Sequence, residues 1–198
     1  VASLTFSQGD VTKPLSIRKA EAGERRSGTL VRVWPNPKYF ESAQLPLAEL
    51  VHLLRSKAVL MPGVVVSLLN EKTKDLQQWQ YKGGLKDYLL QTLDAELLIP
   101  EFEGEGHADA QHESFAEGEG ASWCLAFSSE GPLVRESYVN LIPTPAGGTH
   151  EAGLREGLFQ AVKSFIDLHA LLPKGVKLMP EDVFARASFV LSAKVLDP

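Results

Sequence analysis

The sequence has no long apolar run and almost no cysteine. Because no stretch of about eighteen consecutive apolar residues occurs, a transmembrane helix is excluded and no membrane partner is expected. Cys124 is the only cysteine, which rules out an internal disulfide and favours a reducing, cytoplasmic location. Trp123 and Leu125 flank it, so we expect Cys124 to be a small, buried core residue. Residues 1–10 lack a basic stretch followed by an apolar core, and no secretory signal is expected.

An excess of positive charge is also absent. Lys and Arg together number 20 against 25 Asp and Glu, which gives a net charge of −5. Proteins that coat DNA are usually basic, so any contact with DNA must be local or made by another part of an assembly. The length of 198 residues suits one large domain, or one domain with part of another. The chain starts with Val1 instead of methionine, and we therefore expect a longer parent protein.

The sequence lacks the patterns that catalysis requires. Gly147-Gly148-Thr149-His150 precedes a long helical pattern, and free backbone N–H groups there could bind an anion. No lysine stands where a phosphate-binding loop needs one. The alternative is a tight connection in which Thr149 caps the helix. Gly83-Gly84 indicates a turn, and Ser, His and Asp residues form no nucleophile–base motif, so no catalytic residue is predicted.

An acidic stretch covers residues 100–120, with seven acidic residues, several glycines and no Lys or Arg. This composition is typical of a solvated loop or of an exposed edge strand. His107, Asp109, His112 and Glu113 could be imagined as metal ligands, but their spacing matches no standard closed site. We therefore predict no metal site. A role as an acidic interaction module or metal-binding module stays open as an alternative.

Hydrophobic periodicity predicts a mixed α+β chain. Helical spacing indicates helices over residues 47–58, 85–93 and 151–171, and one further turn at 181–185. Alternation indicates strands over residues 4–6, 15–17, 29–34, 64–69, 77–82, 121–127, 133–140 and 189–196, with Gly9-Asp10 as a turn. The apolar run at 64–69 suggests a well-buried strand. The irregular order of these elements favours helices packed on a mainly antiparallel sheet.

Two basic residues stand on the helix predicted over residues 151–171. Arg155 and Lys163 lie away from the apolar row of that helix and could face a negatively charged partner. The alternative is an ordinary solvated helix face. The apolar row itself comprises Leu154, Leu158, Ala161, Phe165 and Leu168.

Three motifs carry a resemblance to a known family. They are Glu136-Ser137-Tyr138-Val139-Asn140, Gly147-Gly148-Thr149-His150 and Gly153-Leu154-Arg155-Glu156-Gly157-Leu158. Together they resemble the transducer domain of type IIA topoisomerase ATPase subunits. Leu141-Ile142-Pro143-Thr144 and the later Leu172-Pro173-Lys174-Gly175-Val176-Lys177 look closer to the topoisomerase IV branch than to gyrase. Residues 57–64 and 84–89 extend the resemblance upstream, and it is weakest over the acidic stretch.

The resemblance also implies a division of the chain. Ser27-Gly28-Thr29 before a strand resembles the last motif of the GHKL ATPase fold, which would place Thr29 on the adenine side of ATP. Residues 1–36 would then be the terminal strands of a GHKL ATPase sheet. Residues 37–198 would be a transducer domain of two-layer, ribosomal-protein-like fold. Asp197-Pro198 resembles the point just before a loop whose lysine reaches the γ-phosphate.

The family's catalytic glutamate, magnesium-binding asparagine, adenine-reading aspartate and ATP lid have no counterpart here, and the resemblance would place them before residue 1. We therefore expect a piece of an ATP-dependent type II DNA topoisomerase that is inactive and monomeric alone. ATP and magnesium would bind the full-length protein, and neither would bind this piece. The A subunit of topoisomerase IV, DNA and a second copy would be the partners, with Arg155 and Lys163 facing DNA. The alternatives are the matching region of the gyrase B subunit, or a non-catalytic binding module with the transducer fold.

Overall fold

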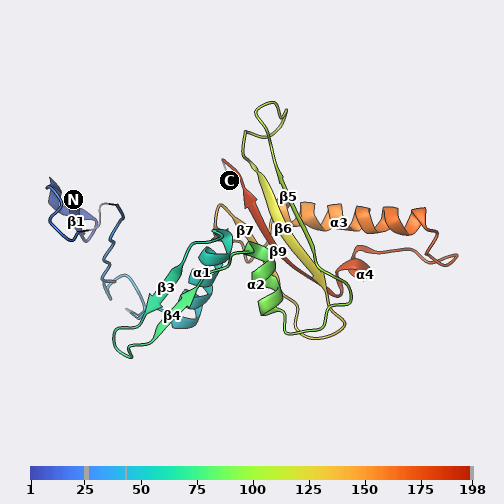
Figure 1. Cartoon of the computed structure of the whole chain (residues 1–198), viewed down its shortest axis with the longest axis horizontal. Helices are drawn as coiled ribbons and strands as arrows, with labels where there is room; N and C mark the ends of the chain where they lie inside the picture. The colour runs from blue at the N-terminus through green and yellow to red at the C-terminus, as the bar shows by residue number, and fades with distance from the viewer. Residues whose placement is uncertain (25–26, 43, 197–198) are drawn as a thin grey trace. The chain divides into compact units, whose positions relative to one another are not determined.

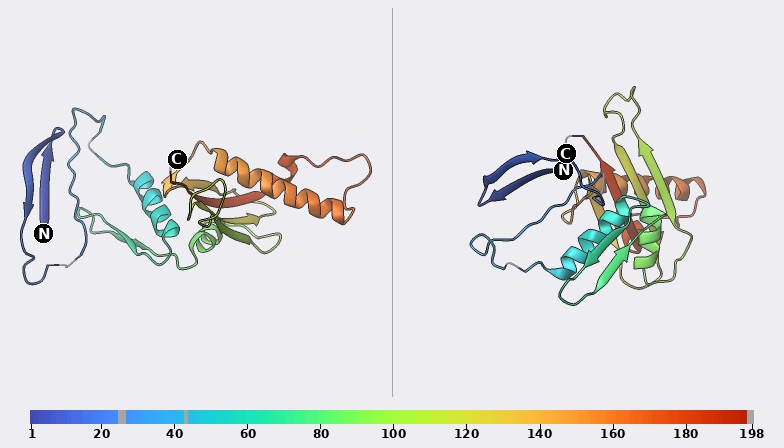
Figure 2. Two further views of the ribbon diagram at one scale, coloured as in Figure 1. Left: turned by 90° about the horizontal axis from the view of Figure 1, so that it is seen from above. Right: turned by 60° about the vertical axis from the view of Figure 1, so that its left-hand side comes forward.

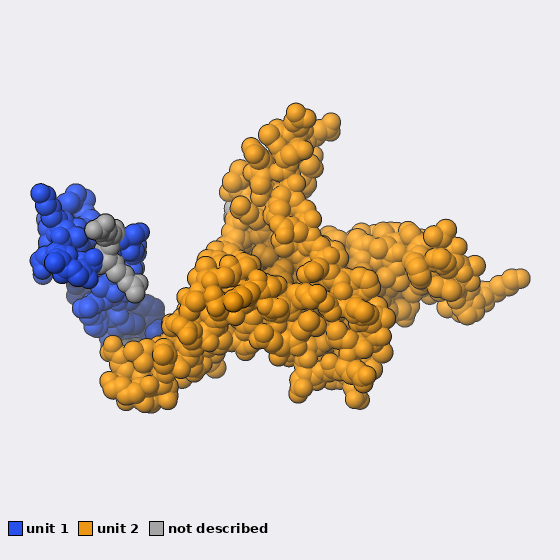
Figure 3. Space-filling view, viewed as in Figure 1, with its two compact units in different colours: residues 1–45 blue, residues 46–198 orange. Residues whose placement is uncertain are grey.

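The computed structural model describes residues 1–24, 27–42 and 44–196. It divides into two compact units, residues 1–45 and 46–198, which Figure 3 shows in two colours. The division after residue 36 that the resemblance implies stays a prediction about domain function.

The first unit contains the predicted N-terminal hairpin. β1 (Ala2–Ser7) and β2 (Asp10–Ile17) pair antiparallel, as the alternation predicts. Gln8 and Gly9 form the turn with φ values of 54° and 94°, and positive φ values are what a tight hairpin turn requires. Both strands are exposed throughout, so apolar side chains such as Phe6 and Ile17 stand uncovered.

The predicted strand at residues 29–34 is wrong as a strand. These residues take no regular secondary structure, and Val31 and Trp34 are 73% and 79% exposed. A strand forms only where a neighbour satisfies its backbone N–H and C=O groups. Within the described ranges no strand lies beside this segment. Alternation of side chains therefore identified a segment that could form a strand, but it did not show whether a partner strand lies beside it.

The second unit holds the remaining helices and strands (Figure 1). Its helices are α1 (Leu47–Leu60), α2 (Gly84–Thr92), α3 (Thr149–Leu168) and α4 (Pro180–Phe184). Its strands are β3 (Val66–Leu69), β4 (Leu76–Trp79), β5 (Phe102–His107), β6 (Gly120–Phe127), β7 (Arg135–Val139), β8 (Ile142–Pro143) and β9 (Ala187–Lys194). Within the described residues, no helix is long and apolar enough to cross a membrane.

A five-stranded sheet organises this unit. Its order is β5-β6-β9-β7-β8, and every neighbouring pair is antiparallel except the parallel pair of β7 and β9. β9 lies in the centre and is almost fully buried. β3 and β4 form a separate hairpin, as predicted. The α+β class and the mostly antiparallel sheet are thus confirmed.

The sheet has helices on both faces. Cys124 and Val190 point to the side of α1 and α2, whereas Leu125 and Phe189 point to the side of α3 and α4. Figure 2 shows α2 and α3 on opposite sides of the strands. The predicted two-layer fold therefore needs one addition, because α3 and α4 form a second helical layer. Cys124 is buried, as predicted.

Helix α3 differs from its prediction at both ends. It begins at Thr149 and ends at Leu168, and Gly148 occupies the capping position without any side-chain cap. Thr149 is therefore not the cap, since the glycine turn brings it into the helix. None of the helix's residues is fully buried, and Phe165 and Leu168 are 58% and 80% exposed. The apolar row predicted the helix correctly, but its packing against the apolar core comes from Leu154, Leu158, Phe159 and Val162, and the last two residues of the row stay exposed.

The prediction of a well-buried strand at residues 64–69 is also wrong. Val64 and Val65 lie outside β3 and are about half exposed. β3 has one partner strand, β4, and its residues alternate between half-buried and exposed. An apolar run shows that a segment can be buried, whereas burial itself requires layers on both faces.

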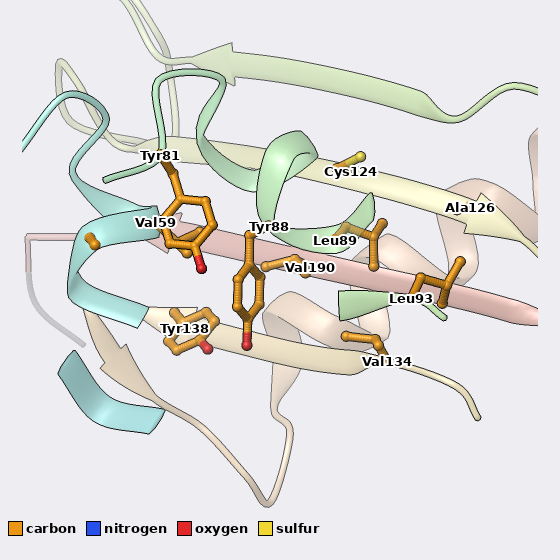
Figure 4. Close-up of a cluster of buried hydrophobic side chains, with 11 residues drawn as sticks. Val59, Tyr81, Tyr88, Leu89, Leu93, Cys124, Ala126, Val134, Tyr138 and Val190 are labelled. Carbon is orange, nitrogen blue, oxygen red and sulfur yellow. The ribbon is translucent and has the colours of Figure 1, made fainter. Parts of the chain in front are cut away.

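A group of tyrosines lies in the core between α1, α2 and β7 (Figure 4). Tyr88 donates its hydroxyl proton to Glu136, 2.9 Å from Oε1, and Tyr138 donates to the same carboxylate. Arg55 donates to the Tyr81 hydroxyl at 3.1 and 3.2 Å. Tyr81 packs edge-on against Tyr88, with 5.7 Å between ring centres. Burial, together with the Glu136 carboxylate, raises the pKa of Tyr88 and Tyr138 far above the usual value for tyrosine.

These raised pKa values predict a stability that falls at high pH. In the unfolded chain both hydroxyls ionise near pH 10, whereas in the fold they stay protonated, so their contribution is complete below pH 10 and is lost above it. Each tyrosine should lower the unfolding free energy by up to about 1.4 kcal/mol per pH unit. Urea unfolding between about pH 8 and pH 11 measures this slope.

Tyr88→Phe should make the decline shallower, because it removes one of the two titrating groups. Tyr39→Phe changes an exposed position outside this core and serves as the control. Equal slopes for Tyr88→Phe and the wild type would contradict the assignment.

Candidate functional site

Strand β7 contacts both helical layers. Successive side chains of a strand point to opposite faces of its sheet. Glu136 and Tyr138 therefore point toward α1 and α2, while Ser137 points toward the start of α3. Arg135 lies on the same face as Ser137 and donates to the Ala187 and Phe184 carbonyls beside α4. We call residues 135–141 the β7 junction.

A chain of hydrogen bonds joins the β7 junction to the first turn of α3. The buried Ser137 hydroxyl lies 2.8 Å from the Thr144 hydroxyl, which in turn lies 3.0 Å from Nε2 of His150. Ser137 also donates to Oε2 of Glu151 at 3.4 Å. These groups satisfy one another, so Ser137 and His150 form a structural connection and are not arranged for attack on a substrate.

The glycine turn brings these groups together. Gly147 has φ 70°, a left-handed conformation that L side chains rarely adopt. A Cβ on Gly147 would lie 3.1 Å from Oε2 of Glu151, and one on Gly148 would lie 2.8 Å from the His150 ring. The carboxylate of Glu151 also stands in the first turn, where it matches the positive end of the helix dipole. These contacts support the tight connection over an anion site.

The turn after β7 is hydrogen-bonded to two further parts of the unit, the end of β9 and helix α1. Asn140 and Leu141 have φ values of 48° and 68°, which allow a tight turn into β8. The Asn140 side chain donates to the Val195 carbonyl at 2.7 Å and accepts from its N–H at 3.0 Å. Lys57 of α1 donates to the Leu141 carbonyl. A left-handed leucine costs about 1–2 kcal/mol, so these bonds hold the turn in a strained form.

Arg155 and Lys163, the predicted DNA-facing residues, lie in different surroundings. The Arg155 guanidinium stacks on the Phe184 ring, 4.4 Å from its centre, and lies 3.9 Å from Oε1 of Glu151. Arg155 is therefore half-buried beside the β7 junction. Lys163 is exposed further along α3. The helix thus presents one cation packed against α4 and another directed to solvent.

The other predicted site residues are not brought into this region. Thr29 belongs to the unit of residues 1–45 and is exposed. Asp197-Pro198 lies outside the described residues. In the acidic stretch, His107 contacts Glu105 at 2.8 Å, while the ring of His112 accepts from its own loop backbone. Across the described ranges, no group of three or more His, Cys, Asp and Glu residues is placed to hold a metal ion.

An apolar cavity of about 420 Å³ lies between part of α3 and the sheet. Gly153 and Gly157 line it from the helix, and Trp123 and Leu191 line it from the strands. A Cβ added to either glycine would meet no atom within 4 Å. Beside this cavity, Leu154, Leu158, Phe159 and Val162 pack α3 against the apolar core beneath it.

Sequence reasoning located the β7 junction through its motif but missed the side-chain contacts that the junction makes. Lys57, Tyr88 and Glu136 act through partners far along the chain, which no local pattern reveals. Asn140 carried one usable signal, because asparagine tolerates left-handed turns and bonds to nearby backbone.

Two glycine-to-alanine substitutions test the tight connection. Gly147→Ala should destabilise the protein by about 1–2 kcal/mol, because alanine must adopt a left-handed φ beside Glu151. Gly153→Ala is the matched control in the helix interior and should stabilise by about 0.5–1 kcal/mol. Urea unfolding of both variants measures the difference. Equal effects of the two substitutions would remove the special role of the turn.

The chain is similar to several known proteins. The sequence profile of the DNA gyrase B family matches residues 84–198. The chain is 41% identical over 196 residues to the B subunit of DNA topoisomerase 4 from Pseudomonas aeruginosa, covering 98% of this chain and 30% of that protein. It is 39% identical over 201 residues to the corresponding protein of Escherichia coli, covering all of this chain and 30% of the relative. The chain thus spans about 30% of the length of these relatives.

Two solved structures are also similar. The topoisomerase IV ATP-binding domain of Francisella tularensis, in complex with a small-molecule inhibitor, matches with a TM-score of 0.74 and 33% identity, over all of this chain and 51% of that one. The 43K ATPase domain of Thermus thermophilus gyrase B, in complex with an aminocoumarin, has a TM-score of 0.69 at 20% identity, over all of this chain and 52% of its own; this likeness concerns the fold alone. The family profile covers more than half of the chain, and the chain belongs to the DNA gyrase B family.

Proposed function

We propose that this chain is part of the B subunit of a DNA topoisomerase IV, and that it couples ATP binding to movement of the DNA gate. The observation that carries the proposal is the 39–41% identity to B subunits of DNA topoisomerase 4 over essentially the whole chain. The complete enzyme would separate interlinked DNA circles and relax DNA at the expense of ATP. It would act in the cytoplasm with the A subunit of topoisomerase IV and a second copy of its own chain.

The β7 junction supports the coupling role. It bonds to α1 through Lys57, to α2 through Glu136, to α3 through Ser137 and to the end of β9 through Asn140. A displacement of any of these elements must therefore be shared by the others or break these hydrogen bonds, three of which are partly buried. Such a joint suits a two-state hinge whose equilibrium a ligand shifts by binding one state more tightly.

The fit of this chain to ATP and magnesium is limited. Thr29 offers one exposed hydroxyl, which suits a contact on the adenine side. The described residues form no cluster of metal ligands, and the sequence has no phosphate-binding loop. Residues of the longer parent protein would hold the phosphates and the metal. When bound, ATP would supply the differential binding energy that favours the closed gate.

Arg155 and Lys163 are proposed to face DNA from α3. Lys163 suits direct phosphate contact, because its ammonium group is exposed. Arg155 already contacts Phe184 and Glu151. Its positive charge would therefore attract DNA from a fixed place near the start of α3.

The activity test combines the full-length parent protein with the A subunit of the enzyme, ATP and interlinked DNA circles. ATP-dependent unlinking without net negative supercoiling is the expected result. Introduction of negative supercoils would instead identify a gyrase, the related alternative. No strand passage by a correctly folded complex would overturn both.

Charge reversal on α3 tests the proposed DNA contact. In the full-length enzyme, Lys163→Glu should reduce the stimulation of ATP hydrolysis by DNA and lower the salt slope of DNA binding by about 1, because one phosphate contact is lost. Hydrolysis without DNA should not change. Lys72→Glu makes the same charge change in the exposed turn between β3 and β4 and should have no effect. If the two variants behave alike, Lys163 does not face DNA.

A further inference from the structure

Strand β5 forms one edge of the five-stranded sheet. It pairs with β6 from Phe102, opposite Leu125, to His107, opposite Gly120. Within the described residues, no strand pairs with its other edge. Figure 1 shows β5 as the outermost long strand, running up to the projecting loop of residues 108–119. An unpaired edge presents backbone donors and acceptors that can pair with another extended chain.

The ladder shows which backbone groups face outward. Ala108 donates its N–H to the Glu119 carbonyl, and an antiparallel ladder alternates its hydrogen bonds residue by residue. The even-numbered residues of β5 therefore turn their backbone groups toward β6. Glu103, Glu105 and His107 turn theirs away from the sheet, where an added strand would meet them.

The side chains on the α2 face of this edge are acidic. Lys86 forms an ion pair with Glu101 and lies 3.9 Å from Glu103. The exposed carboxylate of Glu105 contacts only His107, at 2.8 Å, among the described residues. Residues 100–120 carry seven acidic residues without any Lys or Arg, so negative charge also surrounds the edge at a distance.

The opposite face of the same edge is apolar and open. The Trp123 ring lies across Gly104, close enough that a Cβ there would approach it to 2.5 Å. A Cβ on Gly106 would meet no atom within 4 Å, and Phe102 is 47% exposed. An added strand could therefore place apolar side chains beside Phe102 and over the two glycines.

The negative charges of Glu103 and Glu105 determine which kind of strand can pair with the edge of β5. Two copies of β5 placed edge to edge would bring like charges together across the new ladder, which is unfavourable. Acidic edge residues are one way in which proteins prevent such self-pairing. A basic strand would instead gain opposite-charge pairs across the ladder as well as main-chain hydrogen bonds.

We infer that the outer edge of β5 binds an extended, basic segment of another protein by strand addition. The segment has Lys or Arg at alternate positions, facing Glu103 and Glu105. Its intervening residues are apolar and lie on the side of Gly104 and Trp123. This inference does not depend on the proposed topoisomerase activity, because it rests on the edge of the sheet alone.

The test measures binding of synthetic peptides to the full chain. The first peptide alternates lysine with valine over the six residues of β5. A second has the same composition with its lysines and valines in separate blocks, and a third has alternate backbone nitrogens methylated. The alternating peptide should bind at physiological salt, whereas the block and methylated peptides should not. Equal binding of all three would show unspecific charge attraction and would overturn strand addition.

Two substitutions at one position separate charge from backbone pairing. Glu105→Gln removes one cross-strand charge pair and should weaken binding up to about fivefold. Glu105→Pro also removes the outward N–H and should abolish binding, while an edge strand tolerates proline at such a position. Glu71→Gln, in the exposed turn between β3 and β4, is the control and should bind like the wild type.

Circular dichroism and thermal unfolding of Glu105→Pro serve to check that this variant is folded. If folded Glu105→Pro binds as tightly as Glu105→Gln, the backbone edge is not used and the inference fails. Sedimentation of the chain without peptide measures whether two copies of it associate. Dimers that Glu105→Pro dissociates would identify a second copy as the occupant and would overturn the choice of a basic partner.

Discussion

The alternation of side chains along β7 is the constraint on which the rest of the larger unit depends. Adjacent residues must face opposite sides of the sheet, so Glu136 and Tyr138 bind the α1 and α2 layer while Ser137 binds the start of α3. A shift of one residue in register would direct a carboxylate to the α3 side and leave the buried tyrosine hydroxyls without a partner. The parallel pairing of β7 with the buried strand β9 fixes that register. One strand thereby determines how both helical layers are placed relative to each other.

The conformation that the junction requires is unfavourable locally and is maintained by tertiary contacts. Leu141 adopts a left-handed φ, and Gly147 and Gly148 occupy regions that suit glycine. Each lies where the chain must reverse between elements that are already bonded to β7. The motifs at residues 136–140 and 147–150 therefore supply the turns and hydrogen bonds that connect β7 to α3. Their serine and histidine hold the start of α3 against β7 and the turn that follows it.

Much of the fold could be predicted from the sequence, whereas the site could be predicted only in part. Helices α1 and α2 and strands β6 and β9 follow from periodicity, because their burial agrees with their local pattern. Residues 29–34 and 64–69 failed for the same reason, since apolar patterns do not reveal whether a partner strand or a covering layer exists. The motifs identified the segment around β7, but the roles of Lys57 and Tyr88 depend on contacts between distant parts of the chain. The acidic stretch was predicted as an exposed edge or loop, and β5 with its following loop confirms both.

Helix α3 has the geometry of a lever arm, because its polar contacts lie near its start and its far end is exposed. The helix is bonded through Glu151, His150 and Arg155 near its first turns, while Phe165 and Leu168 near its end remain exposed. Its 20 residues form a rod of about 30 Å, at about 1.5 Å per residue. A tilt of about 5° at the glycine turn would therefore carry the far end through roughly 2–3 Å. Such an arm converts a small rearrangement of hydrogen bonds at the sheet into a displacement large enough to make or break a surface contact.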